Sequence, residues 1–151
     1  MRVVFGFSLV FFIVVFIAVF AYNNFSTEKV VIKPPYFFTP GDAVSQVNSL
    51  AFVFFFSLLA FGLSATLALG IEAAKYSSLF SAGAIGGFDL LFILPSLLAA
   101  FAACELGQGI LDDYEGKGSL FKKTRPALAS LALSIVLLVA LIFGRKYLGV
   151  D

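Results

Sequence analysis

The pattern of apolar and polar positions divides the chain into four long apolar runs separated by polar connections. Each run reaches or approaches the roughly 20 helical residues that are needed to cross the hydrocarbon core of a bilayer. The runs predict helices over 3–22, 48–71, 77–104 and 127–144. We therefore expect an all-α protein, an integral membrane four-helix bundle in one domain, with a long polar connection over 23–47 and an interfacial connection over 105–126.

The composition agrees with a multi-pass membrane protein. Hydrophobic residues make up 61% of the 151 residues and charged residues 13%, whereas soluble domains are about half apolar and about a quarter charged. Membrane lipids are therefore expected partners. The net charge of +1 argues against nucleic acid, whose binding needs a basic stripe. Because the chain has no histidine and one cysteine, the sequence implies no metal and no cofactor.

The third run is too long for a simple span. A single helix over 77–104 would measure about 42 Å, against a hydrocarbon core of about 30 Å. Gly83, Gly86 and Gly87 weaken the helix near its start, and Pro95 removes a backbone hydrogen bond further on. We therefore expect a long third helix that is broken at the glycines or bent at Pro95.

Asp89 follows these glycines and is the main candidate for function. An ionised carboxylate in lipid is costly, so Asp89 should face the bundle interior or have a partner. The other predicted spans contain no lysine or arginine, which leaves hydroxyl groups, freed backbone groups or another subunit as partners. Three roles stay open: a cap or interfacial anchor after the break, a binding group for an ion, proton or substrate, and a contact between subunits. Ser96, on the same helical face, and Glu105, at the end of the span, are the other polar candidates.

The connection between the second and third predicted helices is tight and contains two charged residues, Glu72 and Lys75. Side chains three residues apart face each other on a helix. These two residues are therefore expected to interact.

Small residues recur at helical spacing in two places. Gly62, Thr66 and Gly70 are four residues apart on the second helix, and Gly83 and Gly87 have the same spacing on the third. Small residues let helix backbones approach closely in lipid. We expect these residues to pack the second helix against the third, or one copy of the chain against another.

The segment "FDLLFILPSLLAAFAACELGQG", followed by the basic "KKTRPALA" and a last apolar helix, resembles the stage II sporulation protein M-like family of integral membrane proteins over about the last two-thirds of the chain. Leu94 and Pro95 match the "LPHG" turn of that family, but Ser96 and Leu97 replace its histidine and glycine, and Glu105 lies farther from the proline than the family glutamate does. The resemblance implies a membrane subunit that works in a complex, with a bend at Pro95.

No catalytic motif is present: the sequence has no HExxH, no nucleophile elbow and no paired acids at helical spacing inside a span. We predict a non-enzymatic membrane subunit that packs into a larger assembly with other subunits or with itself. The alternative is a small oligomeric transporter or ion-conducting component that uses Asp89.

Overall fold

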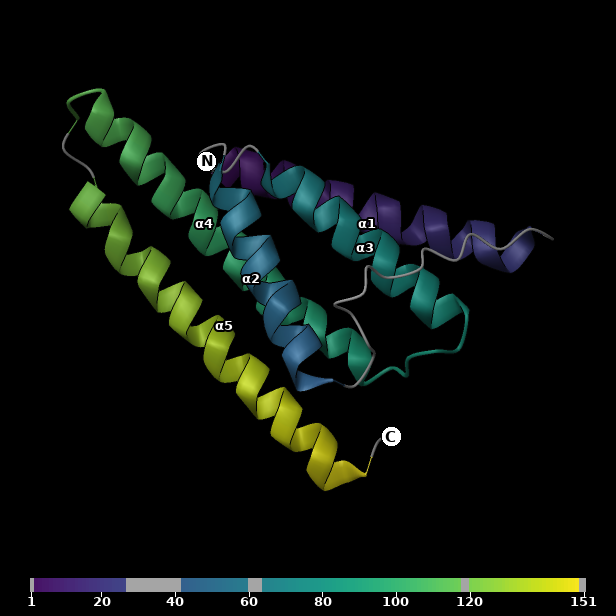
Figure 1. Cartoon of the computed structure of the whole chain (residues 1–151). Helices are drawn as coiled ribbons and strands as arrows, with labels where there is room; N and C mark the ends of the chain where they lie inside the picture. Colours follow the sequence, from purple (N-terminus) through teal and green to yellow (C-terminus); the bar gives the residue numbers. More distant parts are fainter. Residues whose placement is uncertain (1, 27–41, 60–63, 118–119, 150–151) are drawn as a thin grey trace.

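The structure is a computed structural model that describes residues 2–26, 42–59, 64–117 and 120–149, and within these residues the chain forms helices and no strand. The prediction of an all-α fold is therefore confirmed. The helices, in chain order, are α1 (Arg2–Phe25), α2 (Ala43–Leu59), α3 (Ala65–Ser81), the short 3-10 helix η1 (Asp89–Phe92), α4 (Ile93–Tyr114) and α5 (Leu120–Leu148). The α-helices alternate in direction along the chain (Figure 1).

Three stretches of helix are long and apolar enough to cross a membrane: Phe5–Phe25 of α1, Asp89–Tyr114 of η1 and α4, and Leu120–Leu148 of α5. Helix α2 is apolar but shorter, with 17 residues, and at the helical rise it measures about 26 Å. Length and composition therefore support a membrane protein.

The single helix expected over 48–71 is instead a hairpin of two helices, α2 and α3 (Figure 1). Helix α2 begins at residue 43 because Asp42 caps it: its two carboxylate oxygens accept hydrogen bonds from the backbone N–H groups of Val44 and Ser45, both at 3.2 Å. Helix α3 begins at Ala65. The division falls inside a continuous apolar run, so the hydropathy pattern gives no sign of it.

The break expected in the third helix is present between Ser81, the last residue of α3, and Asp89, the first of η1. Gly83 ends α3 with a φ of 69°, a conformation that glycine adopts without steric cost. The N–H of Gly83 bonds to the carbonyl of Phe80 at 3.1 Å, and the N–H of Ala84 bonds to that of Leu79 at 2.9 Å. This pair of bonds is a Schellman motif, which satisfies carbonyl groups at the end of a helix.

The bend at Pro95 stays a prediction. Pro95 is the third residue of α4, which follows directly on η1. The Pro95 carbonyl accepts a hydrogen bond from the Ser134 hydroxyl of α5 at 2.7 Å. Pro95 therefore contributes to the contact between α4 and α5.

Helix α4 does not end near Glu105, as the expected connection over 105–126 required. It continues to Tyr114, and Gly116, with a φ of 75°, follows its end. The N–H of Gly116 bonds to the Asp113 carbonyl at 2.9 Å, so the same type of glycine stop ends both α3 and α4.

Helix α5 begins earlier than expected. The Thr124 hydroxyl bonds to the Leu120 carbonyl one turn before it, at 2.7 Å. Pro126, the last residue of the expected connection over 105–126, therefore lies inside α5.

The helices pack around α4. In the most apolar stretch of Asp89–Tyr114, 50% of the residues are buried, whereas the share is 11% in α1 and 17% in α5. Helix α4 packs against α5 and α2, while α1 packs along α3 (Figure 1). One core cluster joins α2, α3, α4 and α5 through Leu50, Tyr76, Leu79, Ile85, Phe92, Ala99 and Leu138.

Thr66 and Gly70, small residues of the second predicted helix, contact α1 and not the third predicted helix. A methyl group added to Gly70 would lie 2.7 Å from the Phe11 ring, and the hydroxyl oxygens of Thr66 and Ser8 are 2.6 Å apart. Gly62 lies outside the described residues.

Gly83 and Gly87 do not pack one helix of this chain against another, and packing between copies of the chain stays a prediction. Both lie in the break between α3 and η1, and a methyl group added to either would meet nothing within 4 Å. Their role in the structure is to end a helix and connect it to the next.

Candidate functional site

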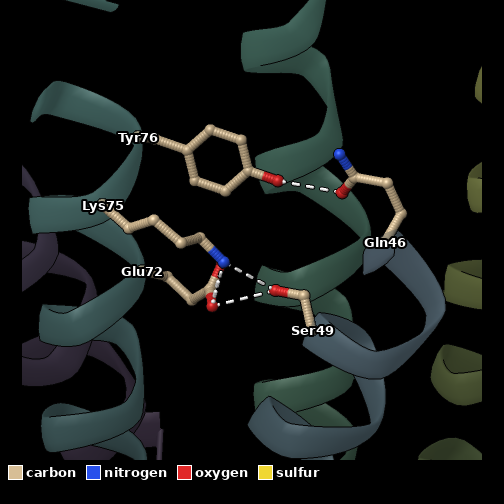
Figure 2. A network of polar contacts seen from close by, with 5 residues as sticks. All are labelled: Gln46, Ser49, Glu72, Lys75 and Tyr76. Carbon is tan, nitrogen blue, oxygen red and sulfur yellow. Dashed lines mark hydrogen bonds and ion pairs between the residues drawn. The ribbon is translucent and has the colours of Figure 1, made fainter. Parts of the chain in front are cut away.

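The α2–α3 hairpin encloses a network of polar side chains (Figure 2). Helix α3 contributes Glu72, Lys75 and Tyr76, whose spacing of three and four residues places them on one face. Helix α2 contributes Gln46 and Ser49, again three residues apart. Because the two helices run in opposite directions, Gln46 meets Tyr76 and Ser49 meets the charged pair.

Three groups form a closed triangle of hydrogen bonds. The Lys75 ammonium donates to Glu72 Oε1 at 2.7 Å and to Ser49 Oγ at 2.8 Å. The Ser49 hydroxyl donates to the same Glu72 oxygen at 2.9 Å. The carboxylate is thus held from both helices.

Tyr76 forms a second link across the hairpin. Its hydroxyl donates to Gln46 Oε1 at 3.2 Å, and the Lys75 ammonium lies 5.1 Å from the centre of its ring. At this distance the cation interacts favourably with the face of the ring. Tyr76 is 1% exposed and therefore joins the network to the apolar core.

The network is deeply buried. Glu72 is 2% exposed and Lys75 is 5% exposed, so both charges have lost most of their hydration. Such a pair is stable only when its charges are close and hydrogen-bonded, and the triangle meets this condition for Glu72 Oε1. Sequence analysis predicted the pairing of Glu72 with Lys75 but placed both in a connection at the end of a span. The structure places them inside α3.

One atom of the network is not satisfied. Glu72 Oε2 is buried and has no hydrogen-bond partner among the described residues. A charged acceptor in this state costs more than the roughly 1–3 kcal/mol typical of a neutral group. Polar atoms of this kind are rare in folded proteins and call for an explanation.

Asp89 lies in a second polar site, where the break meets the end of α5. Its Oδ1 accepts a hydrogen bond from the Arg145 guanidinium at 2.7 Å, and its Oδ2 accepts one from the backbone N–H of Gly86 at 2.8 Å. Of the partners left open by the sequence, a backbone group of the break is present, while Arg145 was not among them. Helix α5 extends to residue 148, past the predicted end at 144, and this extension brings Arg145 to Asp89.

The structure does not gather the three polar candidates of the sequence into one site. Ser96 is buried in the first turn of α4, and Glu105 is half-buried further along the same helix. Sequence analysis missed Gln46, Ser49 and Tyr76, because their convergence depends on the hairpin. The polar i, i+3 spacing within the start of α2 was the available signal.

The chemistry of the two sites is that of paired charges. In the described part of the chain, no three residues of the types His, Cys, Asp and Glu are grouped so that they could hold a metal ion. The chain matches no family model, no curated protein and no solved structure.

Proposed function

We propose that this chain is a non-enzymatic, multi-pass subunit that packs into a larger membrane protein assembly. The observation that carries the proposal is a contrast between the outside and the inside of the helices. The outer faces of α1 and α5 are apolar and largely uncovered, whereas Glu72 and Asp89 are neutralised inside by Lys75 and Arg145.

Large aromatic and branched side chains supply the contact area for such an assembly. In α1, Phe7 is 64% exposed, and in α5 Val136 is 63% exposed. Flat, stiff side chains bury a large area at a small cost in conformational entropy. The resemblance of the last two-thirds of the chain to the stage II sporulation protein M-like family points to the same kind of subunit and stays a prediction.

The contacts of Asp89 favour this proposal over a transporter that uses Asp89. Both carboxylate oxygens already accept hydrogen bonds, from Arg145 and from the backbone of Gly86. An ion bound there would have to displace the guanidinium. We assign Asp89 the role of an anchor between the break and α5, and we expect transport, if present, to be insensitive to Asp89→Asn.

The first test is the composition of the gently solubilised native complex, identified by mass spectrometry. Other membrane subunits at a fixed stoichiometry are expected, and a monomer with no bound protein would refute the proposal. A photo-crosslinking residue at Phe7 or Val136 should capture those subunits. The same residue at Phe12, which is 7% exposed, should give crosslinks within the chain and serves as the matched control.

A further inference from the structure

The first turns of α5 carry a small surface hollow with basic side chains. The hollow has a volume of about 270 Å³ and is lined by Phe121, Lys122, Thr124 and Arg125. Pockets for drug-sized molecules begin at roughly 300 Å³, so this hollow suits a smaller polar group. The Thr124 hydroxyl bonds to the Leu120 carbonyl, which leaves Lys122 and Arg125 as the charged donors of the hollow.

Both cations of the hollow can take an anion from outside the chain. Lys122 and Arg125 are exposed, and within the described residues no ion pair uses either of them. The nearest carboxylates along the chain lie at the end of α4 and just after it: Asp112, Asp113 and Glu115. Of these, Glu115 is paired with Lys117. The hollow therefore carries two positive charges that no described carboxylate pairs with.

The position of the hollow along α5 matches the edge of a hydrocarbon core. Arg125 and Arg145 are 20 positions apart, and no charged residue occurs between them. Twenty residues of helix measure about 30 Å, which is the thickness of the core. With Arg145 at one boundary, Arg125 therefore lies at the other. Lys122 is about 4.5 Å further out along the helix, at the depth of the lipid headgroups.

Exposed aromatic side chains lie at the same end of the helix pair. Phe121, which lines the hollow, is 87% exposed, and Tyr114 at the end of α4 is 90% exposed. Aromatic rings of this kind are typical of the boundary between lipid and water. A soluble anion would contact the two cations alone, whereas a lipid can contact the cations with its phosphate and the Phe121 ring with its apolar part. The combination therefore favours a lipid.

We propose that Lys122 and Arg125 bind the phosphate of an anionic phospholipid headgroup. A guanidinium group binds two phosphate oxygens with parallel hydrogen bonds, and an ammonium group attracts the phosphate as a compact charge. Both residues lie near the start of α5, where the helix dipole adds partial positive charge. This inference goes beyond a role in assembly, because it assigns the subunit a preference for one class of lipid at one end of α5.

The test is a lipid titration of the full chain in a non-ionic detergent, followed by native mass spectrometry. Phosphatidylglycerol and phosphatidylcholine with the same acyl chains are the two probes. We expect the chain to retain phosphatidylglycerol more strongly. Each basic residue near an anionic lipid contributes a factor of about five, so Lys122→Gln/Arg125→Gln should weaken the binding of the first phosphatidylglycerol about 25-fold. Equal retention of the two lipids by the wild type would overturn the proposal.

Lys146→Gln is the matched control for Arg125→Gln, because Lys146 is an exposed cation at the other end of α5. It should leave the binding of the first phosphatidylglycerol unchanged. Equal losses in the two single variants would refute the site, since they would show a general effect of charge. Millimolar inorganic phosphate should not displace the bound lipid. Displacement would assign the hollow to a soluble anion and would overturn its assignment to a headgroup.

Discussion

The Arg145 guanidinium lies 2.7 Å from the Asp89 carboxylate, although the two residues are 56 positions apart in the chain. The side chains are 17% and 5% exposed, respectively. Since Asp89 also accepts a hydrogen bond from the backbone of Gly86, one carboxylate holds the break and the end of α5 together.

Removing either partner of this pair should destabilise the protein. We expect Asp89→Asn or Arg145→Gln to lower the free energy of unfolding by about 2 kcal/mol, since each leaves a largely buried group without its charged partner. The double variant should lose less than the sum of the two single losses. Unfolding by denaturant in detergent micelles measures all three, and additive losses would show that the two residues do not interact.

The contacts of Asp89 also show which features of the site could be predicted from the sequence. A glycine-rich stretch followed by Asp89 was enough to predict a break, with an anchor as one of the three roles left open for Asp89. The partner could not be predicted, because Arg145 lay just past the end of the last predicted helix. The pairing of Glu72 with Lys75 follows from their spacing alone, whereas their burial depends on the division into α2 and α3, which falls within a continuous apolar run.

Glycine at position 83 should be required for the end of α3. Its φ of 69° is unfavourable for a residue with a side chain, so Gly83→Ala should cost about 1–2 kcal/mol. Gly87→Ala is the matched control, because Gly87 lies in the same break, is not among the glycines with positive φ, and has open space around it. Thermal or denaturant unfolding of both variants compares them directly, and equal stabilities would contradict the assignment of Gly83 as the helix stop.

The buried pair in the hairpin should behave differently from an exposed pair. Glu72→Gln leaves the Lys75 ammonium buried without its counter-ion, which should lower the free energy of unfolding by about 3–5 kcal/mol. Glu72→Gln/Lys75→Met should regain most of this loss, because it buries no charge.

The exposed pair of Glu115 and Lys117 is the control for this comparison. Water screens its charges, so Glu115→Gln should leave the stability unchanged. If Glu72→Gln were equally harmless, the charges in the hairpin would have to be hydrated.

The alternating helices predict which connections share a side of the membrane. The end of α1 and the break after α3 lie toward one end of the helix cluster, and the turn between α4 and α5 lies toward the other (Figure 1). If a single span replaced the hairpin, the end of α1 and the break after α3 would lie on opposite sides of the membrane. Cysteines introduced at the exposed positions Asn24, Ala84 and Glu115 distinguish the two arrangements.

In sealed vesicles, a maleimide that cannot cross the membrane should label Asn24→Cys and Ala84→Cys from the same side and Glu115→Cys from the other. The unsubstituted chain is the blank, because its own Cys104 is 1% exposed. Labelling in detergent, where both sides are open, checks that every introduced thiol reacts. Opposite labelling of Asn24→Cys and Ala84→Cys would mean that α2 and α3 do not enter and leave the membrane as a pair. The Glu72–Lys75 network would then lose the hairpin that encloses it.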